Sequence, residues 1–190
     1  MKKLLLGACS ILASANLFAQ GTITFANNNA TAVYNDLTGD KLMAGNTFQA
    51  GLFWAVDGTS DQSLFVQIGA ATNIQPLEGL YSGGTRTTPN GTPGGSAAMF
   101  QVRVWETAYG NSYDAVVANG TQQNGRLGLA GKSDVVRVVT GNPSGIPPSV
   151  PTSLVANGLQ GFTVNVVPEP SVIGLACLGA AALFGLRRRH

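Results

Sequence analysis

The chain has 190 residues, of which 44% are hydrophobic and only 11% are charged. This apolar content argues against a disordered chain, because enough apolar surface is present to build a core. The basic excess lies at the two ends: between Gln20 and Val167, six basic and eight acidic residues give a net charge of −2. A mildly acidic region without a basic cluster lacks the electrostatic footprint of nucleic-acid binding, so no nucleic-acid partner is expected.

The N-terminal segment 1–19 has the composition of a secretory signal peptide. Two lysines precede an apolar stretch that ends in small residues, which predicts export through the Sec route and cleavage between Ala19 and Gln20. A second interpretation is a lipoprotein signal, because residues 6–9 read Leu-Gly-Ala-Cys. Cleavage before Cys9 would leave a very short apolar region, which argues against lipidation.

Residues 20–166 are predicted to form an all-β ectodomain, a single antiparallel β-sandwich of jelly-roll type. Apolar and polar residues alternate with the period of half-buried strands in segments 22–25, 48–54, 64–68, 100–105, 136–138 and 162–166. Glycine-rich residues 82–96 are expected to be a flexible loop, and proline-rich residues 141–153 an extended connector. Because both cysteines lie outside this region, the ectodomain must be held by its own core.

The ectodomain lacks the side chains of many catalytic sites. It has neither cysteine nor histidine, which argues against thiol catalysis, Ser-His-Asp triads and ordinary zinc sites. Catalysis by carboxylates needs neither residue and is therefore not excluded, and a glycosidase would need two acids at a suitable separation. The candidate acids are Asp57, Asp61, Glu78, Glu106 and Asp114. Solvated surface acids are the favoured interpretation, and we expect no catalysis and no cofactor.

Calcium binding is a second possibility, on the oxygen-rich segments 35–40 and 57–61. Neither segment matches the EF-hand loop pattern. Asx turns, in which the side chain bonds its own backbone, are the favoured interpretation, and no metal site is predicted.

Trp105 is the residue most suggestive of ligand binding. The alternation places it on the opposite face from Phe100 and Val102, and an exposed Trp105 beside Tyr109 and Tyr113 would form a sugar-stacking platform. In the alternative, a loop folds over Trp105 and makes it part of the core. Trp54 shares the phase of the apolar residues in its own segment and is assigned to the core.

The C-terminal segment 167–190 has three parts. A Pro-Glu-Pro triplet precedes an apolar run, residues 172–186, that is followed by a basic cluster; the residues concerned are Pro168, Glu169, Pro170, Arg187, Arg188 and Arg189. The run is short for a membrane span of about 20 residues. With flanking arginines that extend toward the interface it is predicted to be a transmembrane helix with a cytoplasmic C-terminus.

This arrangement resembles the PEP-CTERM sorting signal of exosortase-bearing Gram-negative bacteria. The resemblance implies recognition by an exosortase, cleavage near Pro168–Pro170, and transfer to the cell surface or extracellular polymer. The alternative is a plain membrane anchor whose prolines merely end the preceding strand.

Segments 21–25, 100–105 and 158–162 also resemble a group of PEP-CTERM proteins from verrucomicrobial-type bacteria, a likeness that brings no activity with it. The leading hypothesis is a structural or adhesive surface protein without catalysis, associated with extracellular polysaccharide. The alternative is a carbohydrate-binding or glycan-processing module that uses the surroundings of Trp105.

Overall fold

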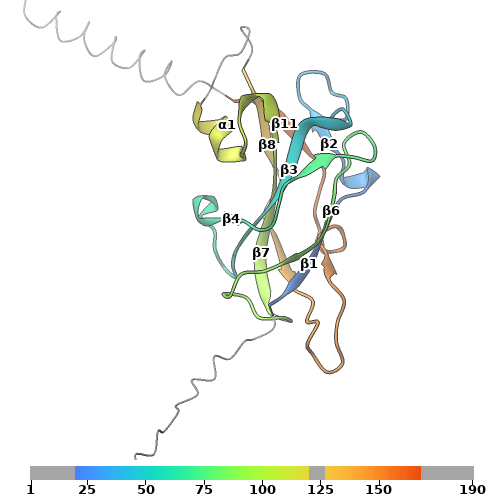
Figure 1. The fold of residues 1–190 in the computed structure, drawn as a ribbon, viewed down its shortest axis with the longest axis vertical. Coiled ribbons are helices and arrows are strands. Elements are labelled where there is room, and N and C mark those ends of the chain that lie inside the picture. Colours follow the sequence, from blue (N-terminus) through green and yellow to red (C-terminus); the bar gives the residue numbers. More distant parts are fainter. Residues whose placement is uncertain (1–19, 120–126, 168–190) are drawn as a thin grey trace, which may run out of the picture.

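The computed structural model describes residues 20–119 and 127–167 (Figure 1). The predicted signal peptide, residues 1–19, and the predicted transmembrane helix and arginine cluster lie outside these ranges. Within them the chain is mostly β-structure, with one short α-helix, α1 (Tyr113–Asn119). The all-β prediction is therefore confirmed at the level of fold class.

The described strands form two sheets. The smaller has three strands in the order β10 (Thr152–Ser153), β1 (Thr22–Ala26) and β6 (Ser82–Thr87). The larger has eight, of which six follow the path β2 (Val33–Asn35), β11 (Phe162–Val166), β8 (Leu129–Lys132), β7 (Ala97–Glu106), β3 (Gly45–Val56) and β4 (Val66–Gln67). Two more strands join this sheet from the side: β5 (Thr72–Ile74) pairs with β3, and β9 (Val136–Val139) pairs with β7.

Short 3-10 turns connect several of these strands. They are η1 (Asn29–Thr31), η2 (Gln62–Leu64), η3 (Thr107–Tyr109) and η4 (Val155–Asn157). Together with α1 they supply the side chains that cover sheet surfaces which the strands alone leave open.

The main core lies between the two sheets. Ile23 and Phe25 of β1 are fully buried against Leu52 of β3, Val102 of β7 and Val164 of β11. β3 and β7 form the long antiparallel centre of the larger sheet, paired from Phe48↔Glu106 to Val56↔Ala98. Each large apolar side chain buried in this way contributes about 1.5–3 kcal/mol to folding, so the sandwich needs no disulfide.

A second buried layer covers the outer face of the larger sheet. Phe53 packs there with Phe65, the residue that follows η2, while Trp105 packs with Val116 of α1. Almost every residue of β7 is therefore buried, whichever face its side chain occupies. The alternation in 100–105 is real, but its more polar face is covered by η2 and α1 and does not meet solvent.

The expectation of a wholly antiparallel jelly roll is wrong at two pairings. β1 runs parallel to β10, with Ile23 opposite Thr152, and β11 runs parallel to β2, with Phe162 opposite Val33. Parallel neighbours need long connections. In both cases the paired strands are far apart in sequence, and alternation carries no information on their relative direction.

The strand predictions hold for β1, β3, β7, β9 and β11 and fail in segment 64–68, and the loop prediction fails for the first part of segment 82–96. In 64–68, Leu64 ends the turn η2 and is 63% exposed, and β4 contains only two residues. The glycine-rich segment 82–96 was expected to be a loop, but it begins with β6, paired with β1. A Cβ at Gly83 would lie 2.4 Å from Cδ1 of Phe25, so glycine lets this strand pass over the aromatic ring.

Candidate functional site

A hollow at one end of the larger sheet is lined by seven polar and three apolar residues. It begins with a tight turn after β2, in which the Asn35 N–H donates to the Asp40 carbonyl at 2.8 Å. The Asn35 side-chain oxygen accepts from the Leu37 N–H at 3.0 Å, and the Thr38 hydroxyl oxygen accepts from the Asp40 N–H at 3.2 Å. These Asx- and ST-type bonds fix the turn and hold Asp40 beside the hollow.

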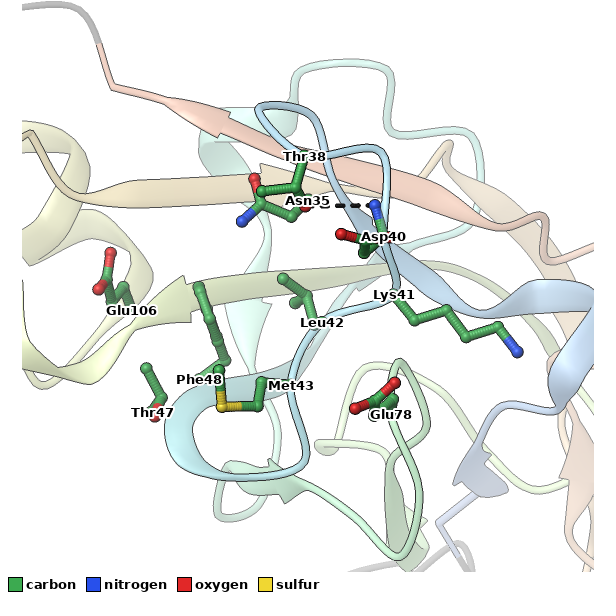
Figure 2. Close-up of a pocket in the computed structure, with 10 residues that line it drawn as sticks. All are labelled: Asn35, Thr38, Asp40, Lys41, Leu42, Met43, Thr47, Phe48, Glu78 and Glu106. Carbon is green, nitrogen blue, oxygen red and sulfur yellow. Dashed lines mark hydrogen bonds between the residues drawn. The ribbon is translucent and has the colours of Figure 1, made fainter.

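The hollow has a volume of about 500 Å³ (Figure 2). Its apolar part is made by the buried side chains of Leu42 and Phe48 together with Met43, which is 65% exposed. Its polar part comes from Asn35, Thr38, Asp40, Lys41, Thr47, Glu78 and Glu106. Small-molecule sites are usually lined mostly by apolar side chains, so this hollow is more polar than most of them.

Three carboxylates and one ammonium group line this hollow. Asp40 and Glu78 are exposed, whereas Glu106, at the end of β7, is only 4% exposed. In the view of Figure 2, Phe48 and Met43 lie between Glu106 and Glu78. Such a set offers hydrogen-bond acceptors to hydroxyl or ammonium groups and an apolar contact for a ring, which suits a polyol or sugar better than an anion.

Two contacts define the fixed parts of the hollow. The Lys41 ammonium donates to the Asn29 side-chain oxygen, and Glu106 Oε2 accepts from the Leu129 N–H at 3.2 Å. A second hollow of about 410 Å³ also has Lys41 and Glu78 in its lining, together with Pro76 and Leu77. The two cavities therefore adjoin at Lys41 and Glu78 and offer more room than one monosaccharide needs.

The predicted glycan residues do not form an exposed platform. Trp105 is 1% and Tyr109 8% exposed, and Tyr113 is partly buried. Trp105 packs with Tyr109, Val116, Ala130 and Val167. The prediction of an exposed Trp105 is therefore wrong, and the alternative is found, because η3 and α1 fold over this end of β7. Trp54 lies in the main core, as expected.

Arg103 explains why the outer face of β7 is polar in sequence and yet buried. Its guanidinium lies 4.2 Å from the Phe53 ring centroid and 5.2 Å from that of Tyr113. It donates to Gln101 Oε1 at 2.9 Å and to the Gln62 carbonyl at 2.6 Å. Burial lowers the Arg103 pKa, and the nearby charge of Asp114 opposes that shift. The residue ties η2 and α1 to the sheet, which is a structural role.

The remaining candidate acids have local partners. Both carboxylate oxygens of Asp57 accept from Arg137 at 2.7 Å, and Asp61 Oδ1 accepts from the Ser63 N–H at 2.9 Å. Asp114 is 3.5 Å from the Arg103 guanidinium. Of the five candidate acids for glycosidase chemistry, the structure brings Glu78 and Glu106 to the same hollow, where they join Asp40 of the oxygen-rich segment 35–40.

Metal binding finds no support in the arrangement of ligands. Within residues 20–119 and 127–167, no group of three or more His, Cys, Asp or Glu side chains could hold a metal ion. The carboxylate of Asp61 and the amide of Asn35 are each engaged in an Asx turn, as the favoured interpretation of these segments expects.

The predicted processing residues fall mostly outside the described ranges. Ala19, Pro168, Glu169, Pro170, Arg187, Arg188 and Arg189 are all in this position, so their predicted roles stay predictions. Gln20 is described: it bridges to Pro93, and its side-chain amide donates to Asn90 at 2.8 Å. In the described part of the chain no helix has the length and hydropathy to cross a membrane.

The comparison with protein families identifies the C-terminal segment. Residues 166–189 match the family model of the PEP-CTERM protein-sorting motif. Neither the curated proteins nor the solved structures give a match. The matched motif implies an exported protein that is sorted by an exosortase. The described part of the chain that precedes the motif forms the two-sheet β-fold set out above.

Sequence reasoning missed most residues of the hollow. Asn35 and Asp40 had drawn attention only as a turn with oxygen ligands, and Thr38, Lys41 and Thr47 had not been singled out. The available signal was the asparagine-, aspartate- and threonine-rich turn directly after a strand. That signal locates a turn, but it does not show that Glu78 and Glu106 meet it in space.

Proposed function

We propose that this chain is a structural or adhesive protein of the cell surface or extracellular matrix, delivered by exosortase and acting without catalysis. It is exported through Sec, cleaved after Ala19, held transiently by a C-terminal transmembrane helix, and then associated with extracellular polysaccharide. The likeness to proteins of verrucomicrobial-type bacteria is part of this proposal. The sorting motif at residues 166–189 is the observation that carries it.

The geometry of the fold supports a role without catalysis. The aromatic residues that would have stacked on a glycan, Trp105 and Tyr109, are buried and pack against Val116 and Val167. Asp57 is paired with Arg137 of β9, and Asp61 accepts from the Ser63 N–H in its own turn. A covered sheet with scattered charges fits a matrix component better than a carbohydrate-active enzyme.

The second candidate is a carbohydrate-binding or glycan-processing module, with the hollow of Figure 2 as its site. The observation that favours it is the lining of the hollow: acids Asp40, Glu78 and Glu106 surround an apolar part that includes Phe48. Acid and amide side chains next to an apolar surface can bind sugar hydroxyls and one face of a sugar ring.

Sorting is tested by the intact mass of the protein from cell-surface and membrane fractions, with and without exosortase. We expect a mature form that begins at Gln20 and lacks the arginine cluster, and we expect it to disappear without exosortase. Retention of residues 187–190 in both strains would overturn the sorting proposal and favour a plain membrane anchor.

The two candidate functions are separated by cosedimentation with the polysaccharide of the producing cells. Wild type is compared with Asp40→Asn and Glu78→Gln in the hollow, and with Asp134→Asn, an exposed acid outside it. Equal binding by all four, without release of reducing sugar, is expected for the structural role. Loss of binding only in the two hollow variants supports the carbohydrate module, and release of reducing sugar that Glu78→Gln abolishes supports glycan processing.

A further inference from the structure

The last strand of the fold runs directly into the sorting motif. β11 pairs on one side with β2 and on the other with β8, where Val166 lies opposite Leu129. The Val167 N–H then donates to the Gly128 carbonyl at 3.0 Å. The motif match starts at residue 166, so Val166 belongs both to the motif and to β11, and Val167 is the first residue after that strand.

Val167 is also buried by side chains from three other elements. It is 7% exposed and packs with Trp105 at the end of β7, Tyr109 of η3 and Val116 of α1. A valine held in this way is fixed by apolar contacts in addition to its backbone hydrogen bond. We call the group Trp105, Tyr109, Val116, Gly128 and Val167 the C-terminal clasp.

Gly128 couples the hydrogen bond of the clasp to its apolar contacts. A Cβ at this position would lie 2.7 Å from Cγ of Tyr109, so the ring packs directly on the backbone that accepts from Val167. The next residue, Leu129, donates its N–H to the buried carboxylate of Glu106 at 3.2 Å. The acceptor strand is thus fixed to β7 at the same point.

We propose that the clasp positions the chain for exosortase processing and must open before processing occurs. This inference rests on the sorting role proposed above. The three positioning residues are Val167, Gly128 and Tyr109, which hold the last residue before Pro168 inside the fold. The closed clasp holds the backbone of Val166 and Val167, directly before Pro168, in hydrogen bonds and apolar contacts.

The physical reason lies in how processing enzymes reach a chain. Susceptibility to cleavage depends on the burial and hydrogen bonding of the affected backbone, and a residue with a bonded N–H and a buried side chain is protected. Local opening at the end of a strand costs less free energy than global unfolding. When opening and closing are fast, the cleavage rate follows the population of the opened state.

The test is a pulse-chase of the full-length chain in its own cells, with and without exosortase, followed by intact mass of the product. Val167→Asp places a charge in the clasp, and Gly128→Ala displaces the Tyr109 ring. Each is expected to shorten the lifetime of the precursor, by about tenfold if the opened population rises tenfold. The mass of the product should stay the same.

A spacer variant distinguishes the effect of the clasp on processing from the effect of global stability. Six Gly-Ser residues inserted between Val167 and Pro168 place an unfolded, accessible segment next to the motif, so the processing rate should rise. Adding Val167→Asp to this spacer variant should then cause no further increase in the rate. The same spacer after Ser144, in a loop elsewhere on the molecule, should leave the rate unchanged. Trp54→Phe, a destabilising change in the main core, should also leave it unchanged.

Failure of the clasp proposal and failure of the sorting proposal give different results in these experiments. Equal processing rates in wild type, Val167→Asp and the junction spacer would overturn the clasp while leaving exosortase sorting intact. Acceleration by Trp54→Phe to the same degree would show that global unfolding governs processing, which also overturns it. Processing that persists without exosortase would instead overturn the sorting role on which the clasp depends.

Discussion

Trp54 and Trp105 lie on neighbouring strands, are both buried, and differ in one hydrogen bond. The indole N–H of Trp54 donates to the Thr92 hydroxyl at 3.1 Å. The indole N–H of Trp105 has no hydrogen-bond partner among residues 20–119 and 127–167. A buried donor without a partner is unfavourable by roughly 1–3 kcal/mol, which its removal would recover.

We therefore expect Trp54→Phe to destabilise the protein more than Trp105→Phe, by about 1–2 kcal/mol. Both changes leave a similar gap, but only Trp54→Phe breaks a buried hydrogen bond and strands the Thr92 hydroxyl. The measurement is urea unfolding followed by fluorescence, since each variant keeps one tryptophan. Equal losses of stability would show that the Trp105 N–H is satisfied.

The ion pair between Asp57 and Arg137 makes the stability of the fold depend on pH. The hydrogen bond from Arg137 lowers the pKa of Asp57 below its ordinary value of 3.8. A carboxyl with a depressed folded-state pKa stabilises the fold above its unfolded pKa and loses that contribution as the pH falls through the folded value.

The difference in unfolding free energy between wild type and Asp57→Asn should therefore be constant above about pH 5 and shrink as the pH falls below 3.8. Unfolding curves at a series of pH values measure it, with Asp134→Asn as a control acid. A difference that does not change with pH would mean that the ion pair does not persist in solution. The effect is modest, because both side chains are partly exposed and solvent screens their attraction.

At the scale of elements, the contact between β8 and β11 depends on a glycine. A Cβ at Gly131 would lie 2.2 Å from the carbonyl oxygen of Thr163, a backbone atom that cannot move aside alone. Gly131→Ala should separate the two strands and destabilise the fold by about 1–3 kcal/mol or more. At Gly91 the nearest atom is a side-chain carbon of Trp54 at 3.1 Å, so Gly91→Ala is the milder control.

Chemical denaturation of Gly131→Ala and Gly91→Ala measures the difference in their stability, and hydrogen exchange shows which strands are loosened. Faster exchange is expected first at the amides of β8 and β11 in Gly131→Ala. If Gly131→Ala were as stable as Gly91→Ala, the close packing of β8 against β11 would be contradicted.

Alternation in the sequence predicted the strands that face the main core and little else about their arrangement. The alternation predicts β3 and β7 because one face of each strand meets the opposite sheet, and the apolar residues Phe48, Leu52 and Val102 mark that face. The pattern failed at 64–68, where Asp61 caps a 3-10 turn and exposes Leu64. Strand direction was not predictable, because pairing of β11 with β2 is decided by long connections and leaves no local pattern.

At the scale of the whole molecule, the two tryptophans report on different layers of one structure. Trp54 lies in the core between the sheets and Trp105 in the outer cluster under α1. β3 and β7 carry both layers, so their unfolding should be cooperative. We expect the denaturation midpoints of Trp105→Phe by fluorescence and by circular dichroism to coincide, and the same for Trp54→Phe.

A fluorescence transition of Trp54→Phe that precedes its loss of strand signal would mean that the outer layer melts separately. That result would also bear on the clasp, since Trp105 belongs to it. Coincident transitions would assign the sandwich and its outer cover to one folding unit.

The sequence was enough to find the sorting motif, but it did not predict the hollow. Pro168, Glu169 and Pro170 are recognisable because a sorting signal is read as linear sequence. The hollow joins Asp40 to Glu78 and Glu106, which are distant in sequence and come together only through the sheet. The sequence left both an exposed and a covered Trp105 open, because nothing in its strand shows that α1 and η3 will cover it.

The placement of β11 between β2 and β8 has a mechanical consequence. The described chain begins near one end of the molecule, at β1, and ends near the other, at β11 (Figure 1). A pull on the C-terminal end acts along β11 and loads its hydrogen bonds to both neighbours at once, in shear. The last strand before the sorting motif is therefore held along both of its edges, and tension must break both sets of hydrogen bonds before β11 leaves the sheet.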